Sequence, residues 1–162
     1  MTLYFALKYL HLIGAAVLLG TGAGIAFFML MAHRTADPPT IAAVGRIVVI
    51  ADFLFTATAV VLQPLTGAWI AWLDGYSFGE GWIVLSILLY LVAGAFWLPV
   101  VWMQMRVRQL ALASAATAAP LPRSYYRLFY TWLGFGFPAF AAVLGIFWLM
   151  LTRPTIALLT WL

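Results

Sequence analysis

The chain has 162 residues, of which 67% are hydrophobic and 7% are charged, whereas a soluble domain has roughly a quarter of its residues charged. It contains no cysteine, which excludes disulfide frameworks, thiolate metal sites, iron–sulfur clusters and thiol nucleophiles. Its net charge of +4 comes from residues near the ends of apolar stretches, so the charge indicates membrane topology and not nucleic-acid binding. The sequence therefore predicts one integral membrane domain over residues 1–162, with the lipid bilayer around it.

Long stretches without Lys, Arg, Asp or Glu follow one another along the chain. Each meets the length of roughly 20 apolar residues that a helix needs to span a bilayer. None shows the sustained two-residue alternation of membrane β-strands. We therefore predict an all-α fold, a bundle of four transmembrane helices. The helices are expected at about residues 3–32, 42–73, 82–111 and 123–152.

The basic residues are divided unequally between the two ends of this predicted bundle. Lys8 and Arg153 lie at the end that holds both termini, and the other basic residues lie at the opposite end. These are Arg34, Arg46, Arg106, Arg108, Arg123 and Arg127. By the positive-inside rule, the asymmetry predicts a multi-pass protein of a bacterial inner membrane with both termini on the periplasmic side. Trp72 and Trp82, which flank the second connection, are expected in an aromatic belt at one interface.

The first predicted helix carries both histidines of the chain. A histidine inside a span is costly unless the bundle buries it, and neutral imidazole is the commonest metal ligand, so His11 is a candidate haem ligand. His33 lies about 33 Å further along the helix, at 1.5 Å per residue, and cannot bind the same iron within one monomer. A haem on His11 would then use Met103 or Lys8 as its second ligand, remain five-coordinate, or take a ligand from another subunit.

Gly20 and Gly24 of the same helix are four residues apart. This spacing lets two helix backbones approach closely in a membrane. We therefore predict a helix–helix contact at these glycines, in preference to a cofactor niche.

The second predicted helix carries a stripe of polar residues on one face. At 100° per residue, its members fall within about 40° of one another's mean line, and we expect them inside the bundle. They are Asp52, Thr56, Gln63 and Thr66. Hydrogen bonding between helices is the simplest role for the threonines and the glutamine. Asp52 differs, because a carboxylate in mid-helix costs about 2.5–3.5 kcal/mol to insert, so we expect either a pairing with Arg46 or Arg127 or a functional role.

The third and fourth predicted helices also carry polar faces. Ser86, Tyr90, Trp97 and Gln104 share one face of the third helix, and Arg127, Thr131, Gly134 and Pro138 share one face of the fourth. Together with the stripe on the second helix, these faces predict a polar interior. Its members are Asp52, Thr56, Gln63, Thr66, Gln104 and Arg127.

Several short motifs are spread over nearly the whole chain. They are KYLHLIG at 8–14, GTGAGIAFFM at 20–29, AHR at 32–34, ADFLFT at 51–56, QPLTG at 63–67, WLPVV at 97–101 and GFPA at 136–139. In this set of motifs the sequence resembles the predicted integral membrane proteins called domain of unknown function 2269. That resemblance implies a membrane bundle and brings no established activity with it.

The first helix, with Lys8, His11 and a second histidine at its far end, is also similar to HemJ-type protoporphyrinogen oxidases and to the membrane part of CopD-type copper-resistance proteins. This looser resemblance implies b-type haem with His11 as its ligand. The third helix of the oxidases begins with Trp-x-x-x-Lys, and here Trp82 is followed by Ser86 at the position of the functional lysine. The difference argues against porphyrinogen oxidation and leaves haem binding as the expectation.

The sequence thus predicts an inner-membrane bundle, forming a homo-oligomer or joined to another membrane subunit. Its His11 and polar interior are expected to bind a cofactor, with b-type haem and membrane redox chemistry as the leading hypothesis. One alternative is a non-catalytic membrane subunit or accessory protein that binds a partner through its glycine-rich faces. Another is a small transporter subunit in which Asp52 couples the transport.

Overall fold

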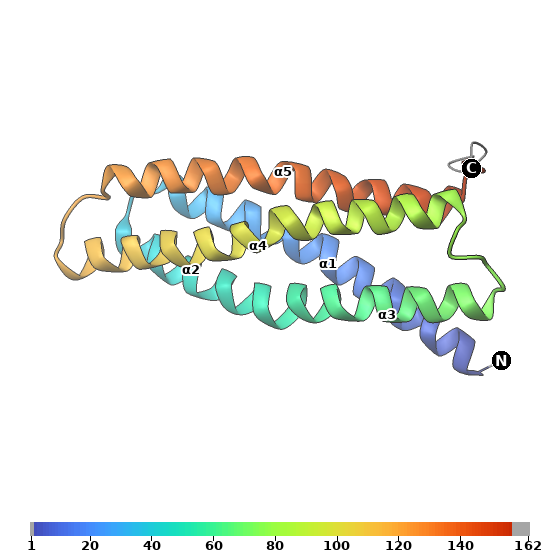
Figure 1. The fold of residues 1–162 in the computed structure, drawn as a ribbon. Coiled ribbons are helices and arrows are strands. Elements are labelled where there is room, and N and C mark those ends of the chain that lie inside the picture. The colour runs from blue at the N-terminus through green and yellow to red at the C-terminus, as the bar shows by residue number, and fades with distance from the viewer. Residues whose placement is uncertain (1, 157–162) are drawn as a thin grey trace.

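The computed structural model describes residues 2–156 of the chain, and these form a bundle of long helices (Figure 1). In chain order, the elements are α1 (Thr2–Arg34), α2 (Pro38–Ala51), η1 (Asp52–Thr56), α3 (Ala57–Leu73), α4 (Gly81–Ala116) and α5 (Arg123–Thr152). The short π-helix η1 joins α2 and α3 into one continuous segment, Pro38–Leu73. The described residues therefore contain four long helical segments and no strand, as predicted.

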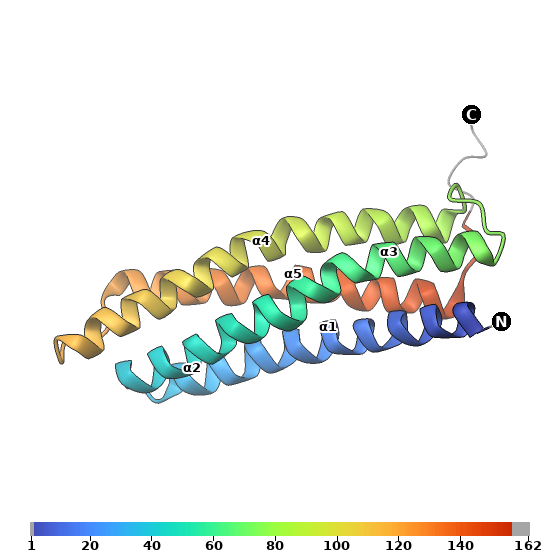
Figure 2. The ribbon, with the colours of Figure 1, turned by 90° about the horizontal axis from the view of Figure 1, so that it is seen from below.

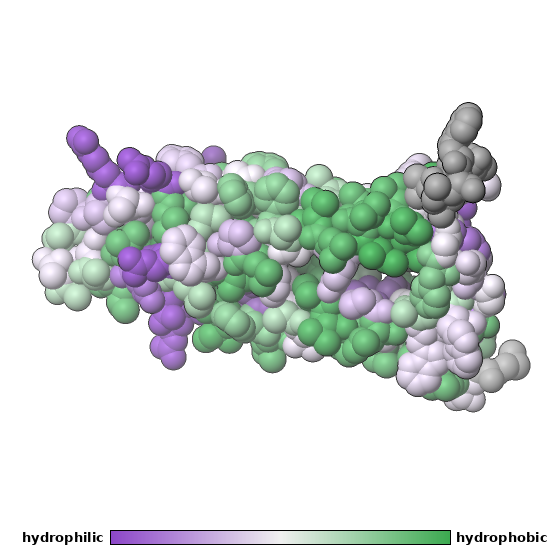
Figure 3. Space-filling view, in the orientation of Figure 1, coloured by the Kyte–Doolittle hydropathy of each residue, from purple (hydrophilic) through white to green (hydrophobic). Residues whose placement is uncertain are grey.

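All four segments are long and apolar enough to cross a membrane. Many of their large apolar side chains point away from the bundle and are exposed, and hydrophobic residues cover most of the face in Figure 3. Lipid suits such an exterior, and helices suit lipid because they satisfy their own backbone hydrogen bonds. The predicted all-α transmembrane fold is confirmed.

The second helical segment begins earlier than its predicted start at residue 42. The Asp37 carboxylate accepts a hydrogen bond from the backbone N–H of Thr40 at 3.0 Å and so caps α2. Hydrogen bonding from Thr40 also lowers the pKa of the Asp37 carboxyl below its usual value. Pro38 takes the first helical position, where proline is favoured because its missing N–H has no partner to lose. The proline pair therefore belongs to the helix and not to the connection.

The bundle has two distinct ends (Figure 1 and Figure 2). The terminal end holds the beginning of α1, the end of α5 and the α3–α4 connection. The arginine-rich end holds the α1–α2 and α4–α5 connections, with the six arginines that predict its cytoplasmic position. In the half nearer the arginine-rich end, one apolar core joins α1, α2, α4 and α5. Its fully buried members include Met29, Ile41, Val107, Tyr125 and Phe129.

In the half nearer the terminal end, the helices separate into two pairs. Here α3 packs mainly on α1, and α4 packs mainly on α5. A small apolar cluster of Ala71, Trp82, Ile83 and Leu149 joins α3, α4 and α5 beside the α3–α4 connection. Figure 3 shows a hollow in this half between α3 and the α4–α5 pair, with hydrophilic side chains at its floor. The hollow therefore lies where the two helix pairs separate.

Trp82 does not lie in a lipid-facing belt, so that prediction is wrong for this residue. Its ring is only 7% exposed, and its Nε1 donates a hydrogen bond to a carboxylate oxygen of Glu80 at 2.7 Å. The Arg153 guanidinium lies over the same ring, 5.8 Å from its centroid. Trp82 therefore closes the terminal end of the bundle, whereas Trp72 is exposed as a belt residue would be.

The predicted helix contact at Gly20 and Gly24 is also wrong within this bundle. A Cβ at Gly20 would meet nothing within 4 Å, and one at Gly24 would meet only Phe28 of the same helix. Gly45 on α2 makes the close approach instead, because a Cβ there would lie 3.2 Å from Cβ of Arg108 on α4. The four-residue spacing indicates where backbones can approach, but not which helix face meets a neighbour.

We expect Gly45→Leu to lower the stability of the bundle by about 1–3 kcal/mol, since the new side chain would force α2 away from α4. Gly20→Leu is the matched control, because it adds the same side chain where no atom lies nearby. Thermal unfolding in mild detergent, followed by circular dichroism, measures both variants. Equal losses of stability in the two variants would show that Gly45 is not the point of close approach.

Candidate functional site

His11 lies on α1 and is held against α3. Its Nδ1 is 2.8 Å from Oγ1 of Thr66, and its backbone carbonyl oxygen accepts a hydrogen bond from Nε2 of Gln63 at 2.9 Å. Thr66 is buried and Gln63 is partly buried, so the expected inward position of this part of the polar stripe agrees with the structure. We refer to His11, Gln63 and Thr66 as the His11 cluster.

Two glycines make room for the His11 cluster. A Cβ at Gly67 would lie 3.0 Å from Cε1 of His11, and a Cβ at Gly14 would overlap the side-chain amide of Gln63. The histidine ring and the glutamine amide therefore occupy space that only glycine leaves open. The sequence pattern alone did not connect these glycines with His11. The available signal was their position, Gly67 directly after Thr66 and Gly14 one turn after His11.

The Thr66 hydroxyl lies between the His11 ring and the backbone of its own helix. Thr66 Oγ1 donates to the carbonyl oxygen of Leu62 at 2.7 Å, the usual bond of a threonine within a helix. With its single hydrogen on that carbonyl, Oγ1 accepts from His11, and Nδ1 of His11 is the donor. In this tautomer Nε2 keeps its lone pair. Metal-ligating histidines are typically oriented in this way, through a hydrogen bond from the other ring nitrogen.

Tyr90 of α4 connects its helix pair to α3. Its hydroxyl donates a hydrogen bond to the backbone carbonyl oxygen of Val60 at 2.8 Å. In an uninterrupted helix that carbonyl would accept from the N–H of residue 64, but Pro64 has none. Tyr90 of α4 therefore supplies the hydrogen bond that Pro64 removes from α3. This hydrogen bond joins the two helix pairs at the level of Pro64.

Asp52 begins η1 and faces α4. It is only 3% exposed, and its Oδ1 and Oδ2 accept hydrogen bonds from Nε1 of Trp97 at 3.3 Å and Nε2 of Gln104 at 3.2 Å. The predicted pairing with Arg46 or Arg127 is wrong, because both arginines are exposed and the partners of Asp52 carry no charge. The carboxyl group thus lies in the apolar bundle with hydrogen bonds but without a cation.

Two buried polar atoms near Asp52 have no hydrogen-bond partner among the described residues. They are Oγ1 of Thr56, one turn along η1, and Oε1 of Gln104, on the same amide that donates to Asp52. Unpaired buried polar atoms are rare, since each costs about 1–3 kcal/mol. Asp52, Thr56, Trp97 and Gln104, which we call the Asp52 cluster, therefore have unused capacity to bind a water molecule or another small polar group.

Because of the π-helix η1, the Asp52 cluster and the His11 cluster face different neighbouring helices. A π turn in effect inserts one residue, which rotates the next helix by roughly 100° relative to an uninterrupted α-helix. Asp52 accordingly faces α4, whereas Gln63 and Thr66 face α1. The predicted stripe is therefore largely buried, as expected, but it meets two different neighbours. Such turns frequently occur at functional sites.

The polar face of α4 has the predicted direction. Tyr90, Trp97 and Gln104 all form hydrogen bonds with the Pro38–Leu73 segment. Ser86 is buried as well, but its hydroxyl donates to the Trp82 carbonyl oxygen of its own helix at 2.7 Å. Polar residues of α1, the Pro38–Leu73 segment and α4 thus lie at successive levels of the bundle, at the Asp52 cluster, at Tyr90 and at the His11 cluster. We call this series the polar column; its levels have separate hydrogen bonds. At 1.5 Å per residue, Asp52 and Thr66 are about 21 Å apart along it.

Arg127 is not part of this interior, and its prediction as an interior residue is wrong. Arg127, Thr131 and Gly134 are all exposed, so this face of α5 points outward.

Met103 is buried in the apolar core with Met29, in the other half of the bundle from His11. It cannot be the second ligand of a haem on His11. Lys8 lies one turn from His11, with its Nζ 4.6 Å from the centroid of the Tyr4 ring.

His33 has a structural environment of a different kind. Its ring stacks on Phe129 with centroids 3.9 Å apart, and its Nδ1 is 3.1 Å from the hydroxyl oxygen of Tyr125. These contacts join the end of α1 to α5 near the arginine-rich end. His11 and His33 therefore serve opposite halves of the bundle, and the two do not share a site.

The sequence matches a known protein family over nearly its whole length. A family model described as "Predicted integral membrane protein (DUF2269)" matches residues 5–154, which include both clusters and all four helical segments. The chain belongs to the DUF2269 family. No curated protein and no solved structure matches the sequence.

The chemistry open to this DUF2269 protein is limited by its side chains. In the part of the chain that the structure describes, no three His, Cys, Asp or Glu residues are grouped to hold a metal ion. His11 is instead a single partly buried histidine, held by Thr66 and Gln63 of α3.

Proposed function

We propose that this chain is a multi-pass protein of a bacterial inner membrane that binds b-type haem through His11 and takes part in membrane redox chemistry. The observation that carries the proposal is the hydrogen bond between His11 Nδ1 and Thr66, which with Nδ1 as the donor leaves Nε2 with its lone pair. The separation of the two helix pairs in this half of the bundle supports it, because it leaves a hollow on the face in Figure 3.

The residues of the His11 cluster would hold a haem through one histidine nitrogen. Thr66 fixes the ring, Gln63 holds the backbone of His11, and Gly67 lets the ring lie on α3. A bound haem would supply one-electron transfer. The protein would contribute burial in an apolar half-bundle, which sets the dielectric around the group.

The polar column gives the bundle a second contribution. A redox change in an apolar environment favours compensation by a proton, and carboxyl and imidazole groups form the proton relays of membrane proteins. Thr66, Gln63, Tyr90 and Asp52 lie in sequence along the column. We assign the Asp52 carboxyl the role of taking up and releasing that proton.

We expect Thr66→Val to weaken haem binding about 10- to 100-fold, the usual loss when the group that orients a ligating histidine is removed. Thr58→Val is the control, since Thr58 is exposed on the same helix and bonds the Leu54 carbonyl in the same manner. Haem titration of the purified apoproteins in detergent gives the affinities. An unchanged affinity in Thr66→Val would show that Thr66 does not orient a ligand.

A transporter subunit is the second candidate, favoured by one observation. The Asp52 cluster combines a buried carboxyl group with two unpartnered polar atoms, and intramembrane carboxyl groups commonly mark ion or substrate pathways. A colourless protein whose reconstituted form moves protons or cations, and loses that activity in Asp52→Asn, would replace the haem proposal by this one.

A further inference from the structure

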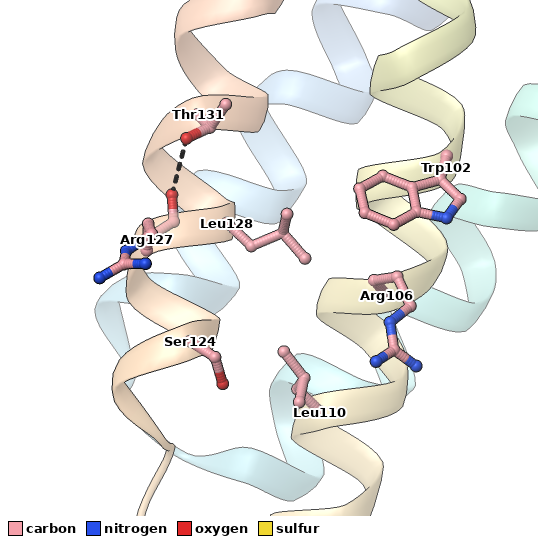
Figure 4. A pocket seen from close by; sticks show the side chains of 7 residues that line it. All are labelled: Trp102, Arg106, Leu110, Ser124, Arg127, Leu128 and Thr131. Carbon is pink, nitrogen blue, oxygen red and sulfur yellow. Dashed lines mark hydrogen bonds between the residues drawn. The ribbon is translucent and has the colours of Figure 1, made fainter.

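A shallow groove between α4 and α5 lies outside both clusters, near the arginine-rich end (Figure 4). Its volume is about 370 Å³. Trp102 and Leu110 line it from α4, and Leu128 of α5 points across the gap between the two helices. The floor and walls of the groove are therefore largely apolar.

Two arginines flank this apolar groove. Arg106 of α4 and Arg127 of α5 both line it, and in Figure 4 their guanidinium groups point away from one another, that of Arg127 toward the far side of α5. Arg106 donates to the Gln109 side-chain oxygen at 2.8 Å, a neutral partner. Residues 81–116 and 123–152, which form α4 and α5, contain no aspartate or glutamate. The positive charge of the groove is thus not neutralised by either of its own helices.

Hydroxyl groups add hydrogen-bonding capacity at the same place. Ser124 and Thr131 line the groove from α5. Thr131 Oγ1 donates to the Arg127 carbonyl oxygen at 3.0 Å and keeps its lone pairs. Two guanidinium groups with nearby hydroxyls match the oxygens of a phosphate diester, since arginine binds phosphate through several N–H groups at once.

We propose that this groove binds an anionic phospholipid, with the long side chains of Arg106 and Arg127 turning to its phosphate and an acyl chain along the apolar wall. The position distinguishes a lipid from a free anion, because the groove opens on the outer surface of the bundle and Trp102 is 56% exposed there. Tryptophan at such a level typically marks the membrane interface. Basic pockets between helices on the cytoplasmic side are a recognised form of anionic-lipid site. The basic-residue distribution predicts that this end is cytoplasmic.

Native mass spectrometry of the full chain released from detergent, with added phosphatidylglycerol, tests the proposal. The double variant Arg106→Gln/Arg127→Gln is expected to bind phosphatidylglycerol about 30-fold more weakly, from the usual contribution of a basic residue near an anionic lipid surface. The control is Arg34→Gln/Arg46→Gln, which removes the same charge from exposed positions at the same end of the bundle. This control should retain the affinity of the unsubstituted protein, and phosphatidylcholine should bind weakly to all three proteins.

Three results would overturn the proposal. Equal weakening in both double variants would show a diffuse attraction of charges and not a site. Equal binding of phosphatidylcholine and phosphatidylglycerol would show that only the apolar wall matters. Displacement of the lipid by millimolar inorganic phosphate would identify a site for the free anion. None of these outcomes depends on haem, because the groove is separate from the His11 cluster.

Discussion

His11→Ala is expected to abolish haem binding while the bundle remains folded. The substitution removes the imidazole ring, whose Nε2 is the proposed ligand atom. His11 is partly buried and is not a member of the apolar core, so the core should stay intact. We expect haem content to fall from near one per chain to a few per cent, measured as pyridine haemochrome on protein expressed with sufficient haem. Circular dichroism and gel filtration of the same samples report the fold.

His33→Phe is the matched control for His11→Ala. The phenyl ring preserves the stacking on Phe129 and removes both ring nitrogens of the other histidine. This variant should retain its haem, since His33 lies in the opposite half of the bundle. Loss of haem in His33→Phe together with retention in His11→Ala would contradict the assignment of the ligand and move the site to the aromatic group on α5.

Asp52→Ala is expected to be among the most destabilising single substitutions in the polar interior, by on the order of 2 kcal/mol. It leaves Nε1 of Trp97 and Nε2 of Gln104 buried without their acceptor. Asp52→Asn should remain close to the unsubstituted protein in stability. The Gln104 amide can rotate so that its unpartnered Oε1 accepts from the new amide nitrogen. Unfolding by a denaturing detergent in mixed micelles gives both free energies.

Thr56→Val separates a specific role of the Asp52 carboxyl from a general sensitivity of η1. Its buried hydroxyl lies beside the Asp52 carboxyl without a well-formed hydrogen bond, so its replacement by a methyl group should change the stability by less than Asp52→Ala does. If Asp52→Ala were as stable as Asp52→Asn, the carboxyl group would not be held by α4. The polar column would then end before it reached Asp52.

The membrane helices could be predicted from the sequence because lipid imposes a simple requirement on them. An apolar stretch of sufficient length between charged residues specifies a span, and the four segments of the structure match the four that were predicted. The inward direction of Asp52 and Thr66 could be predicted for a related reason, since polar groups avoid lipid. Two boundaries differed by several residues. The second segment begins at Pro38 and not at 42, because a proline pair suits both a turn and the first turn of a helix, and α4 continues to Ala116, beyond the predicted end at 111.

The partners of those residues could not be predicted, because they depend on how helices cross. A helical wheel assumes a continuous α-helix, whereas η1 rotates α3 relative to α2, so that Asp52 and Thr66 meet different helices. Arg127 was assigned to the interior from its place on a face with Thr131 and Gly134, but that face points outward. The angle at which α5 packs on α4 cannot be predicted from hydrophobic periodicity or from the spacing of residues.

The glycines illustrate the same limit. Gly20 and Gly24 have the spacing of a close helix contact, yet close approaches between helices occur at Gly14, Gly45, Gly67 and Gly145. Each of these four faces a side chain from another helix, on α3, α4, α1 and α4 respectively. The exposed surface around Gly20 is where the alternative of a partner membrane subunit, or of a second copy of this chain, would have to be tested.

The most direct test of the account is the visible absorption spectrum of the full chain, purified in mild detergent from haem-sufficient cells, before and after reduction with dithionite. Haem bound through His11 would give a strong Soret band that shifts on reduction. A folded but colourless protein at full haem supply would contradict the redox proposal.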